Sequence, residues 1–132
     1  MKKLFVPFII VISLLFGHTT VYSQTINVAD TELCDTLKYA LIGSLRKPID
    51  QAIAEIYQDD EEAPDDLTWA SYQTQILKIK QVGGIGGTYE ISLKVLPYYE
   101  AHNTYGEDIV IVSSTGDLIS YEHIETYSQD NN

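Results

Sequence analysis

The hydrophobic pattern of this chain changes its period part-way along the sequence. Between residues 30 and 58, apolar side chains recur about every 3.6 residues, which predicts an amphipathic helix. At about 100° per residue, the apolar set after Pro48 is rotated by roughly 100° from the set before it. Because a proline inside a helix removes one hydrogen bond and clashes with the preceding turn, we expect a kink or break near Arg46 and Lys47. The two sets are Leu33, Leu37, Ala40, Leu41 and Leu45, and then Ile49, Ala52, Ile53 and Ile56.

Two later segments have the period of strands. Apolar and polar side chains alternate over residues 89–95, which predicts a strand with one buried face. Residues 109–112 read Ile-Val-Ile-Val and are apolar on both faces, so they are expected to form a central strand. The glycine-rich residues 83–87 and the Ser-Thr-Gly-Asp of residues 114–117 predict a hairpin connection and a turn.

Two further strands complete the pattern. Residues 73–82 are expected to place Leu77 and Ile79 on one face, and residues 118–125 to place Ile119, Tyr121 and His123 on one face. A helix followed by antiparallel strands is an α+β order. We therefore expect an N-terminal kinked helix packed on a four-stranded antiparallel sheet, cystatin-like or NTF2-like in outline.

The first 23 residues have the features of a cleavable secretory signal peptide. Lys2 and Lys3 precede thirteen uncharged residues, and Val21-Tyr22-Ser23 suits a cleavage site. Since a membrane span needs about twenty apolar residues, the alternative of an uncleaved anchor is less favoured. We expect a secreted, extracellular protein without stable membrane insertion after cleavage. Its parts would be the signal (1–23), a leader (24–29), a single α+β domain (30–127) and a disordered tail (128–132).

Charge and cysteine content limit the function further. The formal net charge is −11, and loss of Lys2 and Lys3 with the signal makes it −13. Such a field repels nucleic acid and anionic lipid, so no nucleic-acid partner is expected. The only cysteine, Cys34, excludes an internal disulfide. We expect a half-buried helical thiol there, with pairing between two chains as the alternative.

The loop at residues 101–106 is the best candidate for a binding site. It connects two predicted strands, and binding groups concentrate on loops that a rigid scaffold holds. The alternative is that Asn103 and Gly106 simply form the turn while His102 caps a neighbouring carbonyl. The candidate binding residues are Tyr98, Tyr99, His102, Asn103 and Tyr105.

Metal and catalytic alternatives have weaker support in the sequence, and we expect no metal and no cofactor. His102 and His123 with Glu122 or Asp108 would need three or four converging ligands to bind zinc, and no local motif enforces this. A Cys34–His102 nucleophile pair lacks any sequence signal. The acidic run lacks the alternation of a calcium loop and is expected to be solvated, with weak calcium binding as the alternative. Its carboxylates are Asp59, Asp60, Glu61, Glu62, Asp65 and Asp66.

The second half of the chain resembles a known family. The residues that carry the resemblance are Ala101-His102-Asn103-Thr104-Tyr105-Gly106, Ile109-Val110-Ile111 and Gly116-Asp117-Leu118-Ile119, together with the helix over residues 41–57. They resemble the domain-of-unknown-function family 3888 of small exported bacillary proteins, over residues 30–125. The resemblance implies export and one compact domain, and it implies no activity.

Two functional hypotheses remain open. We favour an exported, non-catalytic binding module that contacts a protein or a small ligand through residues 98–106. The alternative is a small hydrolase or isomerase that uses His102 or His123 as general base in a pocket between helix and sheet.

Overall fold

The structure is a computed structural model that describes residues 28–127, with side-chain burial from Glu32 onward. The predicted signal, residues 24–27 of the predicted leader, and the predicted tail lie outside these residues. No helix within the described part of the chain has the length and apolar character needed to cross a membrane.

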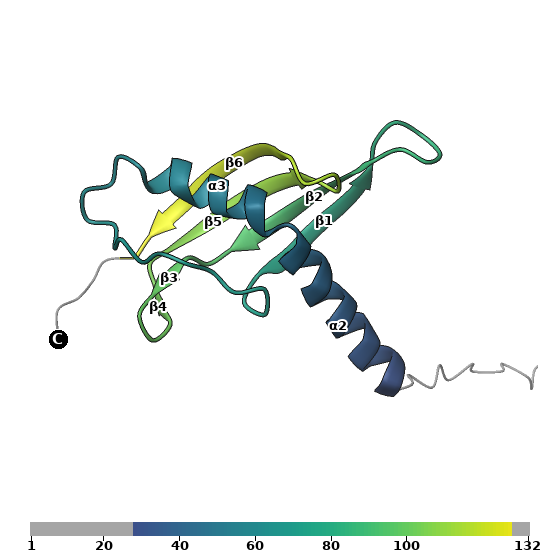
Figure 1. Ribbon diagram of the computed structural model, residues 1–132, viewed down its shortest axis with the longest axis horizontal. Helices are drawn as coiled ribbons and strands as arrows, with labels where there is room; N and C mark the ends of the chain where they lie inside the picture. The colour runs from purple at the N-terminus through teal and green to yellow at the C-terminus, as the bar shows by residue number, and fades with distance from the viewer. Residues whose placement is uncertain (1–27, 128–132) are drawn as a thin grey trace, which may run out of the picture. The chain divides into compact units, whose positions relative to one another are not determined.

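Two helices precede the strands (Figure 1). Helix α2 spans Val28–Ser44 and helix α3 spans Arg46–Tyr57, with Leu45 between them at φ −93° and ψ 14°. Pro48 is therefore in the first turn of α3, where a backbone N–H has no partner inside the helix. A continuous helix would instead press the proline ring against the carbonyl of Ser44. The sequence thus accounts for two helices with a boundary close to Pro48.

The strands form the expected four-stranded antiparallel sheet. Strands β1 (Gln75–Gln81), β2 (Tyr89–Val95), β5 (Gly106–Ser113) and β6 (Leu118–Thr126) lie in the order β1-β2-β5-β6. The prediction that residues 109–112 lie in a central strand is confirmed, because β5 pairs with both β2 and β6. A small second sheet pairs β3 (Tyr98–Tyr99) with β4 (Asn103–Thr104), in the connection from β2 to β5.

Register irregularities alter the faces of the two edge strands. A shift between Ile76 and Lys78 interrupts β1, and a second one on β6 leaves Leu118 opposite Val112. As a result, Ile76 and Leu118 pack against the core. The period-two pattern had grouped Leu77 and Ile119 with the apolar side chains of their strands, and both are about half exposed. A bulge shifts the alternation by one residue, and sequence periodicity does not reveal where that happens.

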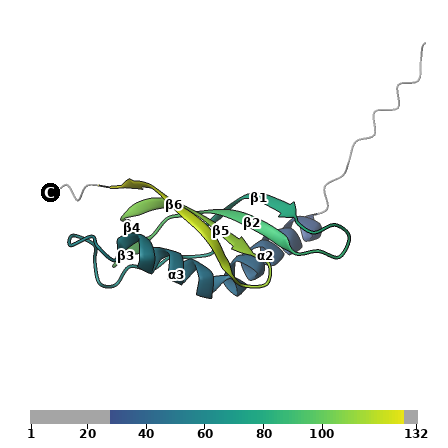
Figure 2. The same cartoon turned by 90° about the horizontal axis from the view of Figure 1, so that it is seen from above.

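The core lies between α3 and one face of the sheet. Helix α3 contacts β5 and β6 (Figure 2), and its residues Ile49, Ala52 and Ile53 are buried as the helical pattern predicts. On α2 the pattern is less reliable, because Leu33 and Leu37 are 55% and 58% exposed. The sheet residues of the core are Ile91, Leu93, Val95, Val110 and Val112.

Candidate functional site

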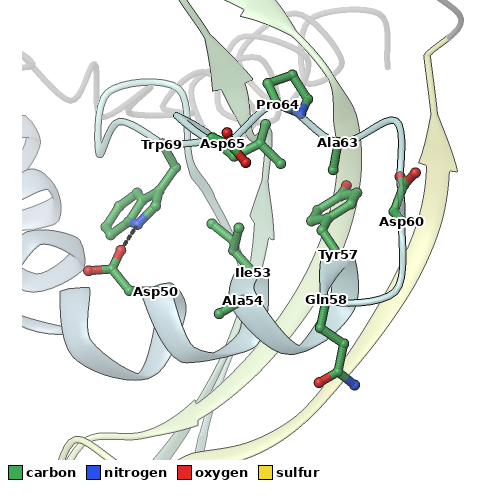
Figure 3. Close-up of a pocket in the computed structure, with 11 residues that line it drawn as sticks. Asp50, Ile53, Ala54, Tyr57, Gln58, Asp60, Ala63, Pro64, Asp65 and Trp69 are labelled. Carbon is green, nitrogen blue, oxygen red and sulfur yellow. Dashed lines mark hydrogen bonds between the residues drawn. The ribbon is translucent and has the colours of Figure 1, made fainter.

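A pocket of about 400 Å³ lies between α3 and the segment that follows it (Figure 3). Ile53 and Leu67 provide apolar lining, while Tyr57 and Trp69 provide rings. Ligand pockets typically combine apolar and aromatic lining with a few polar groups, which is the composition found here. The lining residues are Asp50, Ile53, Ala54, Tyr57, Gln58, Asp60, Ala63, Pro64, Asp65, Leu67 and Trp69.

Trp69 is held in position from both its edge and its face. Its indole Nε1–H donates a 2.6 Å hydrogen bond to Asp50 Oδ1, as the dashed line in Figure 3 shows. The Arg46 guanidinium carbon lies 4.7 Å from the ring centroid, and Arg46 Nη1 is 3.8 Å from the same Asp50 oxygen. Arg46 and Asp50 are one turn apart on α3, so the first half of that helix fixes this side of the pocket.

Asp60 is held on the other side of the pocket. The Tyr105 hydroxyl donates to Asp60 Oδ2 at 2.9 Å, and the Glu62 backbone N–H donates to Oδ1 at 3.0 Å. Burial, together with the hydrogen bond to Asp60, raises the pKa of Tyr105 to about 12. Tyr105, which the sequence suggested as a binding residue, is 2% exposed. It therefore supports the pocket wall from behind.

Behind Tyr57 lies a polar array centred on the buried Asp108. Tyr57 donates its hydroxyl to Asp108 Oδ2 at 3.0 Å, and His123 Nδ1 is 2.7 Å from Asp108 Oδ1. The other His123 nitrogen, Nε2, is 2.9 Å from the Thr126 hydroxyl. Asp108 is completely buried, and this burial raises its pKa although the bonds from His123 and Tyr57 act in the opposite direction. Burial also raises the pKa of Tyr57, and Asp108 adds to the effect.

Gly106, in the predicted binding loop, makes room for this array. A Cβ at this position would collide with the Tyr57 hydroxyl and lie 2.9 Å from the Glu125 carbonyl oxygen. A larger residue would therefore push Tyr57 away from Asp108. The sequence pattern had linked this glycine only with a turn.

The small hairpin formed by β3 and β4 carries the other predicted binding residues. His102 has a φ of 69°, and its ring lies 4.8 Å from that of Tyr98. Its Nδ1 is 3.2 Å from the Tyr72 hydroxyl. The Asn103 amide nitrogen donates to Glu100 Oε2 at 3.4 Å, a bond within the turn. Tyr99 packs edge-on against Tyr105, with ring centroids 6.3 Å apart.

The two histidines have different partners. His102 contacts Tyr72 and Tyr98, whereas His123 contacts Asp108 and Thr126. In the part of the chain that the structure describes, no three His, Cys, Asp or Glu side chains are grouped so that they could hold a metal ion. Neither the two-histidine arrangement nor the acidic run of residues 59–66 forms such a group. Cys34 is exposed, not half-buried as expected.

Most of the pocket was missed by sequence reasoning. The helical pattern places Ile53 on the apolar face of a helix, and the charge of residues 59–66 predicts a solvated run that includes Asp60 and Asp65. A usable signal was present, because the only tryptophan of the chain follows the acidic run closely. A tryptophan tends to bury a large apolar area and to find a partner for its indole N–H, so it favours packing of the segment that follows the acidic run.

Comparison with known proteins gives a match to a family model. No curated protein and no solved structure matches the chain. The family model described as protein of unknown function (DUF3888) matches residues 37–125. The match extends from the second half of α2 to the next-to-last residue of β6, so it includes every residue that lines the pocket. The chain belongs to the DUF3888 family.

Proposed function

We propose that this protein is an exported, non-catalytic binding module that takes its ligand in the pocket between α3 and residues 58–69. The observation that supports the proposal is the pocket itself, whose volume of about 400 Å³ is within the range of small-molecule sites. Its lining places carboxylates around apolar and aromatic surface. A ligand with an apolar body and a polar end would match this arrangement.

The walls of the pocket are fixed before any ligand arrives. Three side-chain hydrogen bonds hold the lining residues: Trp69 donates to Asp50, Tyr105 donates to Asp60, and Tyr57 donates to Asp108. Binding loses less conformational entropy when the contacting side chains are already held in place. These three bonds therefore favour binding more than an equally large cavity with mobile walls would.

The β3–β4 hairpin is proposed as a second contact surface beside the pocket. Thr68 and Tyr98 exchange backbone hydrogen bonds of 2.9 and 2.8 Å, which join the hairpin to the segment that carries Trp69. The exposed rings of Tyr72 and His102 lie on this hairpin side. A peptide ligand could occupy the pocket with one side chain and contact these rings with the next.

A fragment screen by nuclear magnetic resonance tests the pocket proposal. Fragments that bind should shift the Trp69 indole N–H signal, and Ala54→Phe, which fills the pocket, should abolish the shift. Ala40→Phe is the matched control, because Ala40 is an exposed alanine on α2 outside the pocket lining. If hits survive Ala54→Phe, or if no fragment shifts the Trp69 signal, the proposed site is wrong.

A second candidate function has one specific observation in its favour. Asp108, His123 and Thr126 form a carboxylate–imidazole–hydroxyl series with contacts of 2.7 and 2.9 Å. In this geometry the carboxylate orients the imidazole, and Nε2 could accept a proton from the hydroxyl or from water. His123 does not line the pocket, however. Hydrolysis of p-nitrophenyl acetate that is equal in wild type and His123→Gln would eliminate this candidate.

A further inference from the structure

We infer that the pocket takes an organic cation: a primary ammonium or guanidinium group carried on an apolar stem. This inference rests on the proposed function and names the class of ligand. The first observation is the charge of the lining, which includes Asp50, Asp60 and Asp65 and no lysine, arginine or histidine. The net charge of −11 adds a long-range field of the same sign.

The carboxylates of the pocket retain acceptor capacity. Asp50 Oδ1 already accepts from Trp69 and lies 3.8 Å from Arg46 Nη1, so the second oxygen of Asp50 is the one without a hydrogen bond here, whereas the described residues provide no hydrogen bond or ion pair to Asp65. Asp60 is already bonded through both oxygens, so it contributes charge more than free acceptor sites. An ammonium or guanidinium group has several donors and no acceptor, which suits such a lining.

The rings of the pocket favour the same class. A cation is attracted to the face of an aromatic ring, and tryptophan is the strongest of the three aromatic types. The chain itself shows this affinity, since the Arg46 guanidinium lies over Trp69. Tyr57 supplies a second ring, and its hydroxyl is already committed to Asp108. Arg46 already covers one face of Trp69, so a ligand cation would meet the part of that ring that lines the pocket and the ring of Tyr57, which does not offer a free hydroxyl.

The spread of the carboxylates distinguishes an organic cation from a metal ion. Calcium needs six to eight oxygens that converge within about 2.6 Å of one point. Over the residues that the structure describes, no three acidic or histidine side chains are grouped closely enough to hold a metal ion. An alkyl cation requires no such convergence, because its stem can lie on Ile53 and Leu67 while its head reaches one carboxylate. A lysine or arginine side chain of a peptide and a free polyamine share this chemistry.

The fluorescence of Trp69, the only tryptophan, gives a direct assay. The purified protein is titrated with n-pentylamine, n-pentanol and sodium pentanoate, which share a stem and differ in the head group. We expect the amine to bind at least about tenfold more tightly than the alcohol, and the carboxylate to bind weakest. High salt should weaken amine binding more than alcohol binding.

Two variants test whether the preference for the amine over the alcohol arises in the pocket. Asp65→Asn should weaken amine binding several-fold and leave alcohol binding unchanged. Glu122→Gln is the control, because Glu122 is an exposed carboxylate on β6 outside the pocket. A lysine-containing tripeptide and cadaverine, titrated in the same way, distinguish a peptide source from a free polyamine, and tight binding of either supports the inference.

The results separate the ligand class from the site. If alcohol and amine bind equally and Ala54→Phe blocks both, the cation class is wrong and the pocket proposal survives. If amine binding persists unchanged in Ala54→Phe, the site itself is wrong. If calcium chloride displaces pentylamine at lower concentration than sodium chloride of equal ionic strength, a metal ion is the better ligand and the inference is overturned.

Discussion

Replacing Tyr57 with phenylalanine tests the buried array most directly. The substitution keeps the ring and removes only the hydroxyl that donates to Asp108 at 3.0 Å. Asp108 is completely buried, so no water replaces the lost donor at that site. Because a hydrogen bond to a charged group contributes about 1.5–3 kcal/mol, we expect the free energy of unfolding to fall by about 2 kcal/mol at neutral pH.

The decrease in the free energy of unfolding caused by Tyr57→Phe should be larger at neutral pH than at low pH. The pKa of Asp108 in the folded protein is above its ordinary value, and the bond from Tyr57 lowers it. Removing that bond raises the folded pKa further, so the extra cost arises only as rising pH ionises Asp108. At about pH 3 the Asp108 carboxyl is protonated, and the decrease in the free energy of unfolding should shrink to about 1 kcal/mol, as for a hydrogen bond between uncharged groups.

The assay is urea unfolding followed by circular dichroism at both pH values. Tyr89→Phe is the matched control, because Tyr89 is 43% exposed, and it should change the unfolding free energy by less than about 0.5 kcal/mol. In an Asp108→Asn background, residue 108 carries no charge, so Tyr57→Phe should lower the free energy of unfolding by only about 1 kcal/mol at every pH. A loss below about 0.5 kcal/mol at neutral pH, or an equal loss at both pH values, would refute the reasoning.

Three further predictions follow from the geometry. Gly106→Ala, whose Cβ collides with the Tyr57 hydroxyl, should lower the free energy of unfolding in urea by more than about 2 kcal/mol. Gly43→Ala is the control: it has open space around its Cβ in α2 and should raise the free energy of unfolding by about 0.5–1 kcal/mol. Equal effects of the two substitutions would contradict the contact between Gly106 and Tyr57. Since the folded pKa of Tyr105 is about 12 and that of Tyr57 is also raised, stability present below about pH 10 should be lost as the pH rises further. Tyrosinate absorbance at about pH 11 should then be lower in native than in urea-unfolded protein, and identical titration curves would exclude the raised values. Cys34, which is exposed, should react with a thiol reagent as fast in native protein as in denaturant, and strong protection would mean that its side chain is covered.

The sequence was most reliable where local periodicity carries the information. The alternation over residues 89–95 and the apolar run at residues 109–112 correspond to β2 and to part of the central strand β5. Pro48 indicated a boundary between two helices, because its ring and missing N–H act within one turn. These features depend on neighbours only a few residues away, so they can be read before the fold is known.

The candidate site depends on contacts between residues that are far apart in the sequence. His123 meets Asp108 over a separation of 15 residues, and Tyr57 meets the same carboxylate over 51. The pairing of β5 with β6 places Asp108 opposite His123, and the packing of α3 on those strands brings in Tyr57. The sequence therefore determined the segments that form the helices and the four strands of the main sheet, because that choice depends on local pattern, but it did not show the short β3–β4 pair. Only the tertiary structure decided that the acidic segment closes a pocket over Trp69 and that Asp108 is buried, because both depend on strand register and packing between distant segments.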